Sequence, residues 1–165
     1  MVDSGQAVCY HKNTNCKGNK NMAMLTGEYN HQLDAKYRIR IPAKLKKELG
    51  KEFYFAKGTD SCIFVYPKEE VEAILEKVKG ITLGDPRQRS AREFLKTITP
   101  IKEDEQGRLV LSPELRAHIG LEKSDKDLVI CGAGSRVEIW SKKSFDAYFN
   151  NSPVDYDTIV KNLGI

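Results

Sequence analysis

Hydrophobic positions along the chain change their period at regular intervals, and each change predicts an element. Over residues 38–41, isoleucine alternates with arginine, a period of two that is typical of a short half-buried strand. The segment 43–49 follows a proline, places two leucines at i, i+4 spacing and ends at a glycine, which predicts a two-turn helix. Two strands are then expected at 52–57 and 62–66, and a helix at 68–79.

The same order of elements occurs a second time. Segment 34–41 aligns with 104–111 at an offset of 104 − 34 = 70 residues, and 63–66 aligns with 137–140 at an offset of 137 − 63 = 74 residues. The change of offset corresponds to one loop insertion. We interpret the chain as a tandem duplication of a unit of about 45 residues, joined by a linker around 80–89.

The duplication also predicts the second half. Strands are expected at 127–131 and 137–140, helices from Pro113 and at 142–149, and a last amphipathic helix over 156–163. Because a unit this short buries too little apolar surface to fold by itself, the two copies are expected to share one core with pseudo-two-fold symmetry.

Composition and charge exclude several classes of protein. The chain has 27 Lys and Arg against 23 Asp and Glu, a net charge of 27 − 23 = +4, and 40% of its residues are hydrophobic. This composition argues against disorder of the whole chain, and no apolar run approaches the roughly 18 residues of a membrane-spanning helix. Residues 1–23 contain no apolar signal-peptide core. They are interpreted as either a disordered arm or an extension from a start codon assigned too far upstream.

The four cysteines give little support for a metal or catalytic site. None form a Cys-x-x-Cys pair, so a zinc site at Cys9, His11 and Cys16 is disfavoured. Cys62 and Cys131 are expected to be reduced core residues. Nothing in the sequence brings either thiol together with a histidine and a third orienting group, so an enzyme is not expected.

Positive charge is concentrated in one segment. Between Asp34 and Lys47 there are six cations and one acid, a local balance of +5. The cations are Lys36, Arg38, Arg40, Lys44, Lys46 and Lys47. Such a cluster places several cations near a phosphate backbone, and arginine suits a bidentate contact with guanine. A solvated charged face is the open alternative for the three lysines of the helix, whereas Arg38 recurs in the second copy as Arg108.

Each copy carries an aspartate four residues before this arginine. Asp34 and Asp104 are expected to hold their turns by hydrogen bonds to the backbone and to pair with the arginine; turn formation without that partner is the alternative. Lys36 and Gln106 project from the two turns as candidate phosphate or base contacts. A second basic group, over 87–92, is interpreted as either a phosphate contact or an ordinary surface helix.

The opening of the patterned sequence, MLTGEYNHQLD over residues 24–34 followed by Lys36, Arg38 and Ile-Pro-Ala at 41–43, resembles the MraZ family of bacterial transcriptional regulators. The second copy is similar to that family's second half. The resemblance implies an α+β fold in which two tandem swapped-hairpin motifs of the SpoVT-AbrB type form one pseudo-two-fold, β-barrel-like core with short helices. The expected divisions are an extension over 1–23, a first repeat over 28–70, a helix and linker over 71–98, a second repeat over 99–142 and C-terminal helices over 143–165.

The resemblance further implies a cytoplasmic, nucleoid-associated protein that assembles into rings on double-stranded DNA. It would bind direct repeats upstream of the division and cell-wall gene cluster, its own promoter included, and repress transcription. No cofactor, metal, small-molecule ligand or membrane is expected. The alternative is an AbrB-like interaction protein or antitoxin-type protein with a different operator or none.

The candidate interface follows from the motif and its charges. Arg38 occupies the position of the family's expected DNA contact. The expected DNA-binding residues are Lys36, Arg38, Arg40, Gln106 and Arg108, and the expected turn residues are Asp34, Tyr37, Asp104 and Gly107. Because Glu103, Asp104 and Glu105 crowd the second turn, the first repeat is expected to carry more of the DNA affinity.

Two positions depart from the family's pattern. Tyr37 stands where the first motif usually has glycine, so the turn is expected either to change type or to carry about 1–2 kcal/mol of strain. Ser112 stands where the second copy usually has proline, with Pro113 one place later. A shifted helix start without loss of the helix is expected there.

Overall fold

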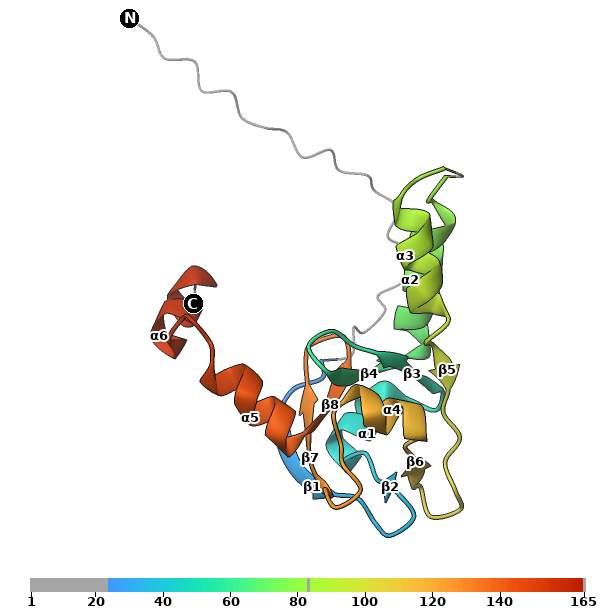
Figure 1. Ribbon diagram of the computed structural model, residues 1–165. Coiled ribbons are helices and arrows are strands. Elements are labelled where there is room, and N and C mark those ends of the chain that lie inside the picture. Colours follow the sequence, from blue (N-terminus) through green and yellow to red (C-terminus); the bar gives the residue numbers. More distant parts are fainter. Residues whose placement is uncertain (1–23, 83, 165) are drawn as a thin grey trace, which may run out of the picture.

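A computed structural model describes residues 24–82 and 84–164, so the expectations for residues 1–23 lie outside the described part of the chain (Figure 1). The helices are α1 (Ala43–Leu49), α2 (Lys68–Lys79), α3 (Arg87–Leu95), α4 (Pro113–His118), α5 (Lys142–Asn150) and α6 (Tyr156–Asn162). The strands are β1 (Glu28–Gln32), β2 (Arg38–Ile39), β3 (Phe53–Lys57), β4 (Cys62–Pro67), β5 (Thr99–Pro100), β6 (Leu109–Val110), β7 (Asp127–Gly132) and β8 (Val137–Ser141).

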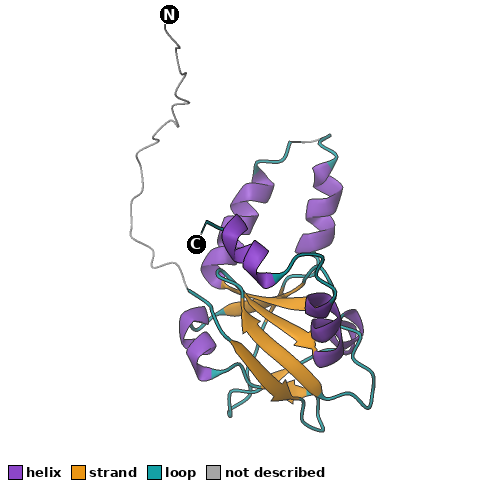
Figure 2. Cartoon of the chain, turned by 90° about the vertical axis from the view of Figure 1, so that its left-hand side faces the viewer, coloured by secondary structure: helices purple, strands orange, loops and turns teal. Residues whose placement is uncertain are grey.

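Six of these strands form one antiparallel sheet in the order β1-β7-β8-β4-β3-β5, and β2 pairs with β6 in a separate ribbon. Figure 2 shows the strands gathered at the centre with the helices around them. The α+β class is therefore confirmed. The expected barrel-like closure is not found in the described residues, because the sheet stays open between β1 and β5.

The two halves exchange their outer strands. β1 precedes the first turn but pairs with β7 of the second half, and β5 precedes the second turn but pairs with β3 of the first half. At the centre of the sheet Phe64 pairs with Glu138, its equivalent at the offset of 74, and in the ribbon Ile39 pairs with Leu109, its equivalent at the offset of 70. A residue can face its own equivalent in an antiparallel pair only on a local two-fold axis. The registers thus agree with the expected pseudo-two-fold symmetry.

Apolar side chains fill both faces of the sheet. One buried cluster lies between the sheet, the ribbon and the short helices α1 and α4, and includes Leu45 and Leu115 at equivalent positions. The second lies under α2, α3 and α5, where Tyr66 and Trp140 are buried as the sequence predicts. Burying apolar area on both faces contributes about 25 cal/mol per Å², so both clusters tie the repeats together.

The start of α4 corrects one expectation. Both α1 and α4 begin at equivalent positions, Ala43 and Pro113, so the helix start is not shifted. Ser112 instead becomes the N-cap, and its Oγ accepts a hydrogen bond from the Leu115 N–H at 3.3 Å. Proline at the first helical position needs no N–H partner, so the two residues together open the helix.

Most helices and the strands of the two hairpins match their predicted ranges. The strands β1 and β5 and the helix α3, which begins within the expected linker, were not predicted. Across the described ranges, no helix combines the length and apolar character that crossing a membrane requires.

Candidate nucleic-acid interface

The two aspartate–arginine turns lie side by side at one end of the molecule, where β2 and β6 form their ribbon (Figure 1). In each turn the aspartate N–H donates to the arginine carbonyl oxygen, at 3.1 Å from Asp34 to Arg38 and at 2.9 Å from Asp104 to Arg108. The Leu111 N–H also donates to the Tyr37 carbonyl oxygen at 3.0 Å. The backbone therefore holds the turns of both repeats in one unit.

Each aspartate side chain closes its own turn. Oδ1 of Asp34 accepts hydrogen bonds from the N–H groups of Lys36 at 2.8 Å and Arg38 at 2.9 Å, while Oδ2 accepts from Arg38 Nε at 2.7 Å. Asp104 repeats the pattern with the N–H groups of Gln106 at 2.9 Å and Arg108 at 3.0 Å and with Arg108 Nε at 2.7 Å. The expected hydrogen bonds and the expected pairing with arginine are both confirmed.

These contacts favour the ionised carboxylates. The hydrogen bond from the Arg38 side chain is the main cause that lowers the pKa of Asp34 from 3.8 to about 2. The pKa of Asp104 is also lowered, chiefly by the hydrogen bond from the Arg108 backbone. Both carboxylates are therefore charged at neutral pH and hold the arginines by charge-assisted hydrogen bonds.

Arg38 also reaches the second turn. Its Nη1 lies 3.4 Å from Asp104 Oδ2, so Arg38 contacts the aspartates of both repeats. The side chains of Arg38 and Arg108 are 20% and 28% exposed. A guanidinium carries five N–H donors, so an arginine oriented by a carboxylate in this way keeps donors that can face a ligand.

Tyr37 keeps the left-handed turn that glycine would adopt. Its φ is 57°, close to the 70° of Gly107, so the turn carries the expected strain of about 1–2 kcal/mol rather than changing type. The guanidinium of Arg116, from α4 of the other half, stacks 3.6 Å above the Tyr37 ring. A stacked cation of this kind contributes about 0.5–2 kcal/mol, which offsets the strain.

Lys46 makes the equivalent reach in the opposite direction. It occupies the position of Arg116 at the offset of 70, and it forms an ion pair with Glu103 beside Gly107. The short helix of each half therefore supports the turn of the other half. Sequence analysis missed Arg116, although its alignment with a lysine of the basic cluster was a signal that this position faces a turn.

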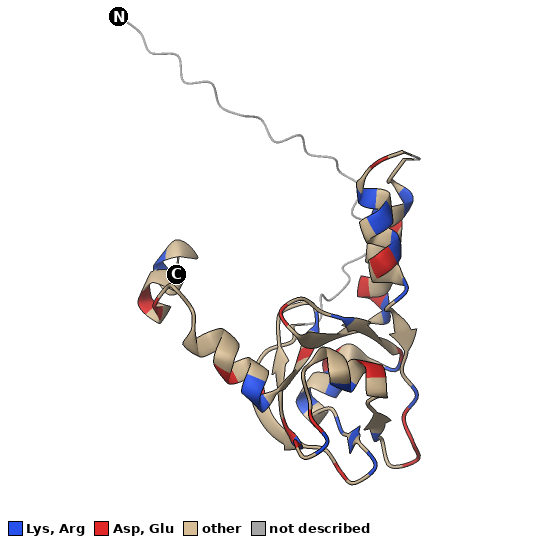
Figure 3. Ribbon diagram, viewed as in Figure 1, with Lys and Arg blue, Asp and Glu red and all other residues tan. Residues whose placement is uncertain are grey.

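The exposed polar groups around the turns are those that the sequence singles out. Lys36, Arg40 and Gln106 are all exposed, and the Arg40 N–H donates to His31 Nε2 at 3.3 Å. The second turn also carries Glu103 and Glu105, so acids and bases are mixed at this end of the molecule (Figure 3). Free positive charge lies mainly with the first turn, because the second brings its own acids.

The second basic group lies elsewhere. Arg87, Arg89 and Arg92 belong to α3, at the far end of the molecule from the ribbon, as Figure 1 shows. Arg87 pairs with Asp85, with Nη2 at 2.6 Å from Oδ2. The structure therefore does not bring this group together with the two turns.

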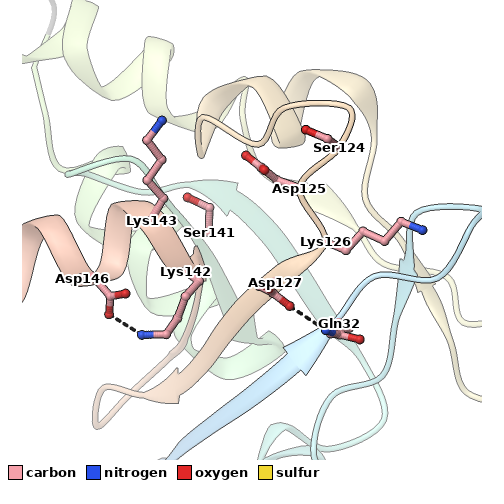
Figure 4. A pocket seen from close by; sticks show the side chains of 9 residues that line it. All are labelled: Gln32, Ser124, Asp125, Lys126, Asp127, Ser141, Lys142, Lys143 and Asp146. Atoms are coloured by element: carbon pink, nitrogen blue, oxygen red, sulfur yellow. Dashed lines mark hydrogen bonds and ion pairs between the residues drawn. The ribbon is translucent and has the colours of Figure 1, made fainter.

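Other candidate chemistry is weaker. Burial raises the pKa of the Cys62 thiol to about 12 and that of Cys131 to about 11, so neither is a thiolate near neutral pH. Among residues 24–82 and 84–164, no group of three metal-ligating side chains gathers. A polar hollow beside α5 holds both Lys142 and Asp146, which pair with each other (Figure 4).

Fold and site together define a class: a chain of two related α+β halves that presents a pair of aspartate–arginine turns. A family model described as "MraZ protein, putative antitoxin-like" matches the chain twice, over residues 24–94 and 94–162. The second match begins 94 − 24 = 70 residues after the first, in agreement with the internal repeat.

Curated relatives match most of the chain. A protein of Thermoanaerobacter sp. (strain X514) named "Transcriptional regulator MraZ" is 41% identical over 141 residues, which are 85% of this chain and 96% of the relative. Proteins with the same name from Carboxydothermus hydrogenoformans and Syntrophomonas wolfei are 39% and 41% identical over the same shares. The chain belongs to the MraZ family.

Proposed function

We propose that this protein is a sequence-specific DNA-binding regulator of transcription that uses the paired turns to read double-stranded DNA. The observation that carries the proposal is the bridge from Arg38 to the aspartates of both repeats. It supports two arginines held at one end of the molecule, with exposed Lys36 and Arg40 beside them. The family's naming as transcriptional regulators supports the same function.

The chemistry of the interface divides between the two kinds of contact. An oriented guanidinium suits the O6 and N7 acceptors of guanine in the major groove, whereas Lys36, Arg40 and Gln106 suit phosphates and neighbouring base edges. Asp34 and Asp104 act as positioning residues, because they fix the arginines before DNA arrives and so reduce the ordering cost of binding.

Few contacts per chain imply assembly. We propose that several copies form a ring and bind direct repeats upstream of the division and cell-wall genes, the protein's own promoter included, and so repress transcription at the nucleoid in the cytoplasm. Linked copies convert weak single contacts into avidity. The exchange of β1 and β5 between the halves supports a swapped-hairpin relation of the repeats.

The test is a titration of the full chain onto DNA from upstream of its own gene and onto scrambled DNA of equal length. Wild-type protein binds the first more tightly, and Arg38→Ala weakens that binding at least tenfold, whereas Arg89→Ala on α3 serves as the matched control and binds as wild type. Equal affinity for both DNAs, or an unaffected Arg38→Ala, contradicts the proposal.

An antitoxin-type interaction protein is the second candidate, favoured by the words "putative antitoxin-like" in the family's description. Such a protein would neutralise a partner protein with or without an operator. The salt dependence of DNA binding separates the two. A regulator that neutralises phosphates loses affinity with a log–log slope of about −0.9 per contact, whereas a protein indifferent to DNA shows no such loss and no preference between the two DNAs.

A further inference from the structure

Exposed apolar side chains collect at the C-terminal end of the chain. Of the nine large hydrophobic residues exposed within the described residues, six lie between positions 148 and 163. They are Tyr148, Phe149, Val154, Tyr156, Ile159 and Leu163. Isolated exposed apolar residues are ordinary, but a contiguous set of this kind marks an interaction surface.

The apolar side chains of this set form a defined groove between α5 and α6. On α5, Tyr148 and Phe149 pack against each other with ring centroids 5.0 Å apart, yet they are 48% and 52% exposed. On α6, Tyr156 and Ile159 face the same groove, which measures about 720 Å³. Tyr156 is 77% exposed, so α6 lacks the cover that a helix with an apolar face needs.

A second apolar groove lies between α2 and α3. It is lined by Val71 and Leu75 of α2, Leu95 of α3 and Ile98 beyond it. Leu75 is 40% exposed at its rim. Helices α2 and α3 project from the opposite side of the molecule from α5 and α6 (Figure 1), so α6 does not cover this groove within its own chain.

The charges around the two surfaces are complementary. The exposed bases Arg89 and Arg92 on α3 and the exposed acid Asp157 on α6 have no ion-pair partner among residues 24–82 and 84–164. One turn further along α6, Lys161 is exposed, and Glu72 is exposed on the rim of the α2–α3 groove. An apolar centre with a charged rim is the ordinary composition of a protein interface.

We propose that α6 of one copy docks into the α2–α3 groove of a second copy. Tyr156, Ile159 and Leu163 enter the groove, Asp157 faces Arg89 and Arg92, and Lys161 faces Glu72. The two surfaces differ and lie on opposite sides of one chain, so the contact is head to tail, and head-to-tail contacts generate rings when the rotation closes. The inference deepens the proposed function, because it names the interface through which the ring would form.

The test is the oligomeric mass of the full chain, measured by light scattering without DNA. Wild type is a multimer, whereas Leu75→Glu in the groove and Ile159→Glu on α6 each give a single chain of 18.7 kDa. Met24→Glu is the matched control, because Met24 is an exposed apolar residue outside both surfaces, and it stays a multimer. Circular dichroism confirms that each variant is folded.

Mixing the two variants decides the geometry. Each retains one intact surface, so an equimolar mixture gives a dimer and nothing larger. A monomeric wild type, a Leu75→Glu variant that stays a multimer through α6–α6 pairing, or a mixture that stays monomeric would overturn the proposal. Arg89→Glu with Arg92→Glu loosens the multimer without touching its apolar centre, and adding Asp157→Arg restores it; failure of that rescue also counts against the docking.

The outcome is independent of DNA binding. A chain that assembles through this interface and shows no preference for its own upstream DNA refutes the proposed regulator and leaves the docking intact. A chain that binds that DNA yet fails the mixing experiment refutes the docking and leaves the regulator intact.

Discussion

Tyr37 is the residue at which the two halves differ most in chemistry while keeping the same backbone. Both Tyr37 and Gly107 adopt a positive φ, but only the tyrosine pays a steric penalty for it. The strain could be predicted from the sequence, because the internal repeat aligns tyrosine with glycine. The compensating Arg116 could not be predicted, because its contact with Tyr37 crosses from one half to the other and depends on how α4 packs.

The Tyr37–Arg116 contact should appear as a coupling free energy. In a double-mutant cycle of Tyr37→Gly and Arg116→Ala, the destabilisation by Arg116→Ala is smaller in the Tyr37→Gly background by about 0.5–2 kcal/mol, because the ring under the guanidinium is gone. Urea unfolding measures the free energies. Lys46→Ala is the control: it serves the other turn, so its effect adds to that of Tyr37→Gly. An additive Arg116→Ala would show that the stacking contributes nothing.

The Asp34 carboxyl gives a second measurable consequence. Its pKa is lowered in the folded protein from 3.8 to about 2, so its ionised form stabilises the fold above pH 3.8, and this contribution is lost as the pH falls towards 2. In Arg38→Gln the pKa rises towards 3.8, because the main hydrogen-bond donor is removed. Carbon NMR titration measures it. Asp155, whose pKa is lowered chiefly by the Thr158 backbone, stays unchanged; an equally low Asp34 pKa in the variant contradicts the assignment.

At the scale of elements, periodicity predicted those whose apolar face packs within their own half. Helices α1 and α2 and both hairpins have such faces. The strand β1 was missed because alternate residues are exposed and its partner belongs to the other half. The strand β5 has only two residues, one of them proline, and α3 has no buried residue, so neither leaves a readable pattern.

The cap of α4 tests the corrected helix start. Ser112→Ala removes the acceptor for the Leu115 N–H and lowers the free energy of unfolding by about 1 kcal/mol. Ser112→Gly costs only about a few tenths of that unit, because the exposed N–H groups gain access to water. Denaturant unfolding of both variants checks the order. A Ser112→Ala variant as stable as wild type would mean that Pro113 sets the helix start without the serine.

At the scale of the whole molecule, the candidate site was only partly accessible to sequence reasoning. The two motifs could be aligned, and Arg38 and Arg108 could be named, because the aspartate and arginine recur at the same spacing. The pairing of Arg38 with Asp104 and the support of each turn by the opposite helix arise from the pseudo-two-fold packing. Packing of this kind is set by tertiary contacts and leaves no local signature.

The asymmetry of the two turns predicts an asymmetry in binding. Arg38→Ala weakens DNA binding more than Arg108→Ala, because Glu103 and Glu105 repel phosphates at the second turn, and the loss of a phosphate contact reduces the log–log salt slope by about 0.9. Titrations at several salt concentrations measure both the affinity and the slope. An Arg108→Ala variant that weakens binding much more than Arg38→Ala contradicts this prediction.

The exchange of outer strands has a consequence for how the chain is made. During synthesis β3 and β4 leave the ribosome before β5, which ends at Pro100, and β1 waits for β7, which ends at Gly132. Neither half can complete its sheet while the rest is still being translated. The protein therefore matures in one late cooperative step, and premature termination between the halves leaves a fragment with unpaired strand edges that invites proteolysis.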